Sequence, residues 1–349
     1  MDLGKLDKQQ LNKLFAQKLG KTTNKIIQGS SFGVDTAIIR INQNKCLITS
    51  SDPASFIPSL GVKESAWLTV ILTANDIATS GYLPQYAQFV LNLTHTMNKD
   101  KLTQYWNYIH QFCSEIGISI TGGHTGFDDI GNSTLAGGTT MFTIGDIEAV
   151  KTSAFAQPNQ DLILTKSAAI SSASILAKSF PDYTKKNLGE KTYKTLEDSF
   201  YQTSIISELK VLKAKPNLFQ KITAMHDVTE GGSLGAIYEL CEASKVGVSV
   251  NVKKIIINKE QEKICNLFQI PPLRSTGAGS LLIACEKKAS TFIIKELQKH
   301  HISSAIIGKT LPLDEGKWII DSKGKKELNY WDKDPYWEAF FTGIKKGFK

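Results

Sequence analysis

Four aspartates stand where predicted strands or helices begin or end, and each adjoins small or turn-forming residues. Converging carboxylates would repel one another unless a cation neutralised them, and hard oxygen ligands of this kind suit Mg²⁺. Mg²⁺ would in turn bring phosphate oxygens to the same place. Each aspartate also has an ordinary structural interpretation, as a turn residue or a helix cap. The four are Asp35 in "GVDTAII", Asp52 in "LITSSDP", Asp76 in "TANDIATSG" and Asp227 in "AMHDVTEGG".

The predicted helix that carries Asp76, over about residues 64–80, has a polar stripe containing this single acid. Thr69, Thr73, Asp76 and Ser80 follow one another at i, i+4, i+7 and i+11, and no Lys or Arg occurs from position 64 to the end of the helix. Thr and Ser are poor choices for a solvated helix face. The stripe therefore predicts either the wall of a cleft or subunit interface, or a partly buried helix with small polar neighbours.

A second stretch, "ITGGHTGFDDIGNSTLAGGTT", is crowded with glycines. Such residues permit positive φ angles and close approach of the backbone to a ligand, and N–H groups in these turns can form anion-binding nests. His124 fits either a phosphate contact or a bond to the backbone. Asp128 and Asp129 also fit a solvated loop tip.

Lys166 ends the predicted strand "DLILTK" and precedes the Ser-rich helix start "SAAISSAS". A helix N-terminus favours anions, and a lysine beside it would reinforce that preference. The arrangement predicts a site for a phosphate or carboxylate. Ordinary capping of the helix by serine, with a surface lysine, is the equal alternative.

Several common sites are excluded by spacing. The two GKT triplets have no Gly five positions earlier, so a P-loop is excluded, and "TGAGSLL" lacks the third Gly of a dinucleotide fingerprint. No Gly-x-Ser-x-Gly elbow occurs. The five cysteines form no Cys-x-x-Cys pair, which argues against zinc and for reduced core thiols.

Composition and hydropathy argue against nucleic acid and membranes as partners. The net charge of +8 comes from dispersed lysines, so no nucleic-acid partner is expected. No apolar run approaches the roughly 18 residues of a membrane span, and the N-terminal residues have no signal-like apolar core, so we expect no membrane association and a cytoplasmic location. The N-terminal stretch instead predicts an amphipathic helix with Leu11, Leu14, Phe15 and Leu19 at helical spacing.

Strands and helices alternate along the chain, and 349 residues are too many for one ordinary core. We therefore predict two α/β or α+β domains, over residues 1–152 and 153–349, joined near the polar stretch "TSAFAQPNQ". Strands are expected at 36–41, 45–50, 86–94, 118–123 and 139–147 in the first domain, with a Gly-rich loop after 123. A long helix over 191–213 is expected in the second.

Taken together, the ordered motifs are more specific than any one of them. The set "GVDTA", "SDP", "NDIATSG" followed by Pro84, "GGHT", "LTK", "HDVTEGG" and "STGAGSLLIA" resembles the AIR synthase superfamily. That superfamily includes aminoimidazole ribonucleotide synthase, thiamine-monophosphate kinase, selenophosphate synthetase and the hydrogenase maturation factor HypE. The similarity spans about residues 25–310 and is closest to the HypE and AIR-synthase-related branch, through "MHDVTEGGSLGAIYELCEAS" and the "NDIA" helix.

The resemblance implies a two-domain fold whose N-terminal domains pair in a homodimer around a β-barrel-like core. It implies ATP bound without a P-loop, with Mg²⁺ held by Asp residues. By motif match, Asp35, Asp52, Asp76 and Asp227 would be metal or nucleotide residues. Asn75 and the set Gly122, Gly123, His124 and Thr125, which is GGDT or GGET in relatives, would contact the nucleotide. Asp227 and Glu230 match the two acids of the kinase motif D-x-S-D-G-L.

Some positions depart from the family pattern. His124 replaces an acid, and the chain ends "GIKKGFK" where HypE proteins end in the Cys that carries the carbamoyl group; the last cysteine here is Cys285. The N-terminal Cys-or-Sec and Lys segment of selenophosphate synthetase is missing, and the adjacent acids of the kinase are replaced by "GVDT".

The resulting expectation is an enzyme that uses ATP and Mg²⁺ to transfer the γ-phosphoryl group to an oxygen of a small substrate. His226, Lys166 and Asp227 are the candidate catalytic or substrate-contacting residues. Two alternatives stay open: a small-molecule kinase of the thiamine-phosphate type, and a non-catalytic maturation partner that handles a separate carrier protein.

Overall fold

The computed structural model describes residues 4–5, 8–15, 18–21, 23–54, 56–94, 97–127 and 135–349. It divides into two compact units. Unit 1 comprises Met1–Asn24, Ser30–Asp35 and Lys151–Lys349, and unit 2 comprises Lys25–Gly29 and Thr36–Val150. The division falls after residue 150, and the N-terminal residues group with the C-terminal half of the chain.

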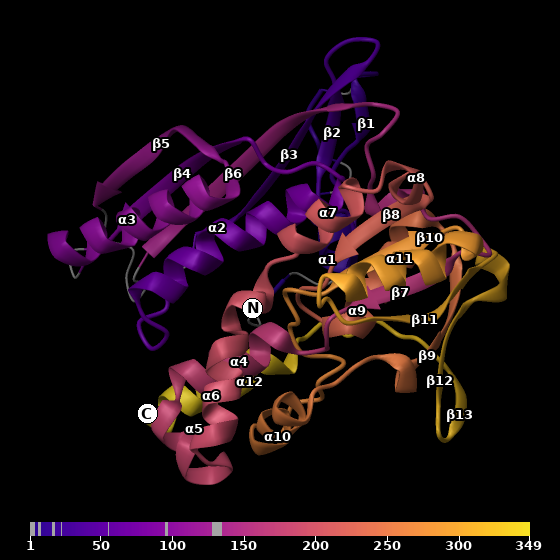
Figure 1. Ribbon diagram of the computed structural model, residues 1–349. Coiled ribbons are helices and arrows are strands. Elements are labelled where there is room, and N and C mark those ends of the chain that lie inside the picture. The colour runs from indigo at the N-terminus through magenta and orange to yellow at the C-terminus, as the bar shows by residue number, and fades with distance from the viewer. Residues whose placement is uncertain are drawn as a thin grey trace. The chain divides into compact units, whose positions relative to one another are not determined.

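Unit 2 is built on a six-stranded sheet, sheet A, with helices α2 and α3 against it (Figure 1). The strand order is β1-β2-β3-β6-β4-β5, so β1 and β5 form the two edges. Every neighbouring pair is antiparallel except β4 and β5, which are parallel. The elements are β1 Ile26–Gln28, β2 Ala37–Arg40, β3 Lys45–Pro53, α2 Val62–Thr79, β4 Tyr86–Leu93, α3 Lys99–Ile116, β5 Ser119–Phe127 and β6 Leu135–Asp146.

Local sequence explains several of these elements. The turn between β2 and β3 is closed by Asn42, whose side chain accepts hydrogen bonds from the N–H groups of Asn44 and Lys45. Helix α3 begins after Asn98, whose side chain caps Lys101, and ends at Gly117 in the left-handed conformation. These boundaries lie within a few residues of those predicted.

The polar stripe of α2 lies inside unit 2. The hydroxyl of Thr69 is 2.6 Å from that of Tyr105 in α3, and Thr73 and Ser80 are fully buried. The side chain of Ser80 donates to the carbonyl of Ile77. The stripe is therefore part of a buried helix with small polar neighbours, and only Asp76 in it is half-buried.

Unit 1 is built on a seven-stranded sheet, sheet B, in the order β13-β12-β9-β11-β7-β10-β8. Only β9 and β12 pair in parallel. The strands are β7 Asp161–Thr165, β8 Ile222–Asp227, β9 Gly247–Asn251, β10 Leu281–Cys285, β11 Ser304–Leu311, β12 Lys317–Asp321 and β13 Gly324–Glu327.

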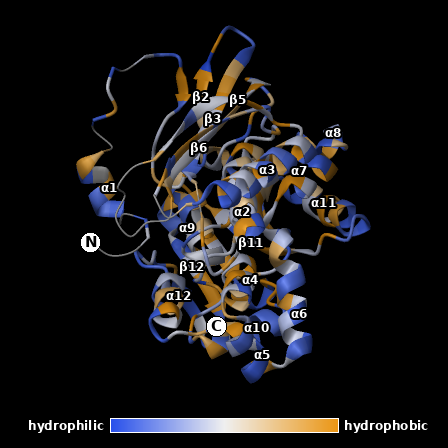
Figure 2. Ribbon diagram, turned by 90° about the vertical axis from the view of Figure 1, so that its left-hand side faces the viewer, coloured by the Kyte–Doolittle hydropathy of each residue, from blue (hydrophilic) through white to orange (hydrophobic). Residues whose placement is uncertain are grey.

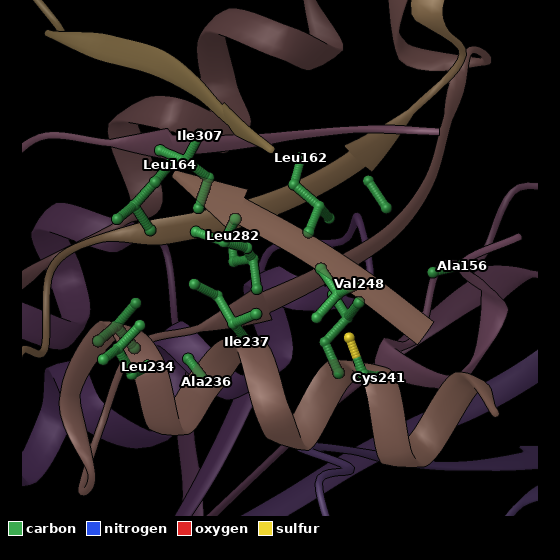
Figure 3. Packing of buried hydrophobic residues seen from close by; sticks show 14 of the residues in the cluster. Ala156, Leu162, Leu164, Leu234, Ala236, Ile237, Cys241, Val248, Leu282 and Ile307 are labelled. Atoms are coloured by element: carbon green, nitrogen blue, oxygen red, sulfur yellow. The ribbon is translucent and has the colours of Figure 1, made fainter. Parts of the chain in front are cut away.

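Helices flank this sheet. Helix α9 packs on it through the hydrophobic core of Figure 3, whereas α11 contacts β7 and β11. The α-helices of unit 1 are α1 Lys8–Leu14, α4 Ile170–Ser179, α5 Pro181–Leu188, α6 Glu190–Asp198, α7 Ile206–Lys213, α8 Pro216–Phe219, α9 Gly232–Ser244, α10 Lys259–Leu267, α11 Lys287–Lys299 and α12 Pro335–Lys345. Outer helices such as α6 and α11 mix hydrophilic and hydrophobic residues (Figure 2).

The core between α9 and sheet B fixes the residues that flank it. Ile237 of α9 points toward Leu282 and Cys241 toward Val248, and all four are buried (Figure 3). Burying one such Leu or Ile side chain stabilises the fold by about 1.5–3 kcal/mol. Because Asp227 is the last residue of β8 and α9 begins at Gly232, the turn between them is held at both ends by this core.

Two sequence predictions differ from the structure. The predicted helix over 191–213 is broken into α6 and α7 by the 3₁₀ helix η2, Ser199–Thr203. The predicted loop after residue 123 is instead a continuation of strand β5 to Phe127. All five cysteines are buried and unpaired, as expected. In the part of the chain that the structure describes, no helix has the length and apolarity to cross a membrane.

Candidate functional site

Two of the predicted aspartates lie on the same side of sheet A. Residues alternate between the faces of a strand, and in β3 the side chains of Cys46, Ile48 and Ser50 are on the more buried side. Ser50 donates a hydrogen bond of 2.7 Å to Oδ2 of Asp76 in α2. Asp52, two residues after Ser50, belongs to this same face. Both Asp52 and Asp76 are half-buried, so part of each residue is accessible.

Asn75 does not share the partial exposure of Asp52 and Asp76. Its side chain is completely buried within α2. The predicted contact between Asn75 and a nucleotide therefore has no support from its exposure.

Of the two glycines of "GGHT", Gly123 is required by the pairing of β5 with β4. Gly122 and Gly123 have φ angles of 152° and 145°, and a Cβ on Gly123 would lie 1.8 Å from the carbonyl oxygen of Phe89 in β4. A Cβ on Gly122 would meet no atom within 4 Å. Gly122, Gly123, His124 and Thr125 are all exposed on the edge strand β5. The side of β5 away from β4 therefore offers backbone groups to a ligand, in an extended strand instead of a nest.

The donor chemistry of unit 2 fits Mg²⁺. This ion is usually held by one or two carboxylates together with waters and substrate phosphates. Asp52 and Asp76 supply two carboxylates on one face. Among the described residues, no group of three or more His, Cys, Asp or Glu side chains is assembled that could hold a metal alone. The phosphates of a nucleotide would therefore have to complete the coordination. Asp128 and Asp129 lie outside the described residues.

Asp35 and His226 form a buried cluster in unit 1, defined here as the His226 cluster, with Ser153 and Glu239. Nδ1 of His226 is 2.8 Å from Oδ1 of Asp35, and Nε2 is 3.2 Å from Oε2 of Glu239. Ser153 Oγ is 3.1 Å from Oδ2 of Asp35. Tyr330 donates to the other oxygen of Glu239 at 3.1 Å. The carboxylate of Asp35 is therefore held by protein groups.

The charges of this cluster compensate one another. Burial alone would lower the pKa of His226, but the carboxylates of Asp35 and Glu239 raise that pKa well above its ordinary value. Burial would raise the pKa of Glu239, but Lys5 and His226 lower it. With a carboxylate oxygen facing each ring nitrogen, this geometry favours a protonated imidazole that donates from both nitrogens. A doubly donating His226 cannot accept a proton from a substrate, so its geometry favours a positioning role over that of a base.

Asp227 begins the segment Asp227–Gly232, called here the acidic loop, between β8 and α9. Asp227 is 2% exposed, whereas Glu230 is half-buried. Gly231 and Gly232 have φ angles of 81° and 63°, which an L side chain rarely adopts. The N–H of Gly231 donates to Asp334 at 2.8 Å. Burial raises the pKa of Asp334 to about 6, although its backbone hydrogen bonds lower it.

The N-terminal segment also reaches the acidic loop. The backbone N–H of Lys5 donates to Glu230 at 3.0 Å, and its ammonium donates to Thr229 at 3.2 Å. Further along, Lys8 pairs with Glu242 in α9. Sequence reasoning missed Lys5 because nothing in the N-terminal pattern links it to residues more than 200 positions away. It also missed Glu239, although a buried acid in a helix otherwise rich in apolar residues is a signal that could have been used.

Lys166 does not lie beside an open helix terminus. Its ammonium forms a 2.8 Å ion pair with the buried Glu208 and donates to three backbone carbonyls. In the first turn of α4, the N–H of Ser172 donates to the carbonyl of Thr276. Both parts of the predicted anion site are thus engaged by the chain itself, and the contact between Lys166 and a substrate has no geometric support.

Comparison with known proteins places this geometry in a family. The profile described as "AIR synthase related protein, N-terminal domain" matches residues 33–143, and "AIR synthase related protein, C-terminal domain" matches residues 157–321. A hydrogenase expression/formation protein of Methanocaldococcus jannaschii is 25% identical over 281 residues, which cover 77% of this chain and 76% of that protein.

Solved structures share the fold at lower identity. The crystal structure of a HypE–HypF complex matches with a TM-score of 0.71 and 16% identity, covering 92% of this chain and 99% of that one. AaThiL complexed with AMPPCP and TMP matches with a TM-score of 0.70 and 17% identity, covering 95% and 99%. The N-terminal profile falls on the long segment of unit 2, and the C-terminal profile falls on the long segment of unit 1. The chain therefore belongs to the AIR synthase related family, a superfamily of ATP-dependent enzymes.

Proposed function

We propose that the chain binds Mg-ATP and transfers the γ-phosphoryl group to an oxygen of a small substrate, as in the amide- or carbonyl-activating members of its family. The observation that carries the proposal is the shared face of Asp52 and Asp76, fixed by the 2.7 Å bond from Ser50 to Asp76. AaThiL, which has the same fold, was crystallised with the ATP analogue AMPPCP.

The proposed roles follow from the chemistry of phosphoryl transfer. That reaction depends mainly on positioning and on neutralising the charge of the phosphates, which is what a bound Mg²⁺ supplies. Asp52 and Asp76 would hold the ion. The exposed edge of β5, from Gly122 to Thr125, would offer N–H groups to the nucleotide.

In unit 1, Asp227 and Glu230 remain the proposed second acidic group, for metal or acceptor. Asp35, which the sequence suggested as a metal ligand, is assigned instead to holding His226, because its carboxylate is bound by that imidazole and by Ser153. His226 in turn keeps its charge next to Asp227. We therefore propose that Asp35 and His226 position the neighbouring Asp227 and do not take part in the chemistry themselves.

The acceptor oxygen or sulfur is proposed to come from outside this chain. All five cysteines are buried, and burial raises the pKa of Cys113, Cys241, Cys265 and Cys285 to about 12. Such thiols are neither accessible nor ionised. A reaction of the HypE type would thus require a carrier cysteine on a separate protein.

Asp76→Asn tests the proposal. The substitution preserves shape and removes the charge, so the affinity for Mg-ATP measured by calorimetry should fall by about tenfold or more, the equivalent of about 1.4 kcal/mol. Asp100→Asn, an exposed acid in the first turn of α3, is the matched control and should bind as the wild type does. Equal affinities of Asp76→Asn and wild type would refute the assignment of Asp76.

A small-molecule kinase is the second candidate, supported by the buried cysteines and by the fold shared with AaThiL. A panel of phosphate-accepting alcohols and phosphomonoesters, assayed for phosphorylated products, separates it from amide activation. A third candidate is a non-catalytic partner protein, and the HypE–HypF structure shows that this fold can bind a protein. It predicts a stable complex without ATP turnover on any substrate of the panel.

We also propose that two copies pair through sheet A. On the face opposite α2, Tyr86 and Val90 of β4 and Ile144 of β6 are 37%, 40% and 46% exposed. Tyr86 stacks on Phe142 at 5.3 Å, which extends the apolar surface across two strands. An apolar sheet face of this kind is typical of a protein interface.

A further inference from the structure

The ammonium group of Lys166 is surrounded by four oxygens. Nζ lies 2.8 Å from Oε1 of Glu208 and 2.5, 3.0 and 3.1 Å from the carbonyl oxygens of Ser204, Gly279 and Gln202. The side chains of Lys166 and Glu208 are 14% and 0% exposed. We call these four oxygens the Lys166 cage. One negative charge and three carbonyl dipoles around one positive charge are the surroundings of a monovalent cation.

The cage is built by a break between two helices and by the close approach of Gly279. The break between α6 and α7 leaves the carbonyls of Gln202, in η2, and Ser204, just after it, outside both α-helices, and both accept hydrogen bonds from the ammonium. Gly279 has a φ angle of 113°, and a Cβ there would lie 2.2 Å from the carbonyl oxygen of Gln202. Only glycine therefore allows these two segments to approach closely enough to share one cation.

The carboxylate in the cage is itself fixed. Thr165 donates to Oε1 of Glu208 at 3.1 Å and accepts from the N–H of Leu281 at 2.9 Å. Ser207 donates to Oε2 at 2.8 Å. Because Glu208 is held in place, removing the ammonium would leave a buried charge rather than a side chain that moves into solvent.

The cage is connected to the acidic loop through the segment Ser275–Ser280, called here the backing loop. Gly279 supplies a cage carbonyl, and the neighbouring Ser280 accepts the N–H of Val228 at 3.0 Å. The N–H of Gly277 donates to the carbonyl of Thr229 at 3.2 Å. The acidic loop thus rests directly on the backing loop, one end of which is held by Lys166.

We propose that Lys166 is a tethered monovalent cation: it occupies a cation site that ammonium or K⁺ can fill when the side chain is shortened, and it positions the acidic loop through the backing loop. The wall of this site is formed by Glu208, Gln202, Ser204 and Gly279. Neither the cation site nor the positioning of the acidic loop rests on the proposed function.

Lys166→Ala tests the cation site. The variant should melt about 10 °C below the wild type, because a buried carboxylate has lost its partner. Added ammonium, methylammonium or K⁺ chloride should recover at least half of that loss by binding the folded state. Tetramethylammonium chloride at the same ionic strength should recover none, because it is too large and has no N–H donor.

Lys317→Ala is the matched control. Lys317 is 15% exposed and pairs with Glu242 at 2.6 Å, so it has similar burial and one carboxylate partner. Its melting temperature should respond equally to all four salts. Recovery of Lys166→Ala by tetramethylammonium as well, or by no cation, would overturn the cation site.

Amide hydrogen exchange tests the positioning. In Lys166→Ala, amide exchange in the acidic loop and the backing loop should be about tenfold faster or more, and ammonium should slow it again. Unchanged exchange in these loops would overturn the proposal that Lys166 positions the acidic loop. Lys166→Met, which keeps the stem without the charge, provides a second variant in case Lys166→Ala does not fold. It should show the same fast exchange but no recovery, since the methionine fills the site. Both measurements are made without nucleotide, so their outcome is independent of whether the enzyme transfers phosphate.

Discussion

At the scale of single residues, the structure separates the predicted aspartates by their partners. Asp76 accepts a hydrogen bond from Ser50 and is half-buried, whereas Asp35 is held by a histidine. Their sequence contexts are alike, since each stands beside a β-branched residue and two positions before an alanine. The difference could not be predicted, because it depends on His226, which lies 191 positions from Asp35 along the chain.

His226 gives the free energy of unfolding a characteristic pH dependence. Because its folded pKa is raised, its contribution is fully present below the unfolded value of about 6.5 and is lost as the pH rises through the folded pKa. From pH 6.5 upward the stability of the wild type should therefore fall, by at most about 1.4 kcal/mol per pH unit from this one group.

Denaturant titration of His226→Gln at several pH values measures this term. The variant should lose about 3 kcal/mol at pH 6.5, because two buried carboxylates lose their cation, and should show a smaller decline above that pH. His110→Gln, an exposed histidine in α3, is the control and should retain the slope of the wild type. An equal slope in His226→Gln and wild type would show that His226 is not the titrating group.

At the scale of elements, apolar periodicity was sufficient to predict the positions of most helices and strands. Helix α2, helix α3 and strand β4 lie within a few residues of their predicted bounds. In the two segments that were predicted wrongly, tertiary contacts determine the secondary structure. Helix 191–213 breaks where its carbonyls bind Lys166, and the residues of "GGHT" extend strand β5 because β4 pairs with them, although their composition favours a loop.

Gly123→Ala tests the second of these contacts. The new Cβ would overlap the backbone of Phe89, which cannot move without breaking strand pairing, so unfolding free energy should fall by about 3 kcal/mol or more. Gly122→Ala places its Cβ in open space and should cost only the backbone strain, about 1–2 kcal/mol. Similar losses in the two variants, measured by urea denaturation, would mean that β5 is not paired closely with β4.

At the scale of the whole molecule, composition and length predicted two α/β units, and the motif order predicted the family. The resemblance to the family did not predict where the N-terminal residues lie. They group with unit 1, in which Lys5 contacts Glu230 and Lys8 pairs with Glu242. Nor could the resemblance distinguish the branch of the family, because the shared motifs belong to the nucleotide machinery and not to the acceptor.

Val90→Glu tests the proposed pairing of two copies. A charge in the middle of the apolar face of sheet A should convert a dimer into a monomer in light-scattering measurements, because its burial would be unfavourable. Phe292→Glu, at a 60% exposed position on α11, is the control and should keep the mass of the wild type. A wild-type protein that is monomeric at micromolar concentration would contradict the pairing outright.

The most direct measurement of the central claim is a double-mutant cycle for Mg-ATP affinity with Asp52→Asn, Asp76→Asn and the double variant, by calorimetry. If both carboxylates hold one ion, the loss of either disables the site, so the double variant should bind about as weakly as the weaker single variant. The coupling energy should then exceed about 1 kcal/mol. Losses that add to within about 0.5 kcal/mol, or single variants that bind Mg-ATP as the wild type does, would contradict a shared metal site on this face of sheet A.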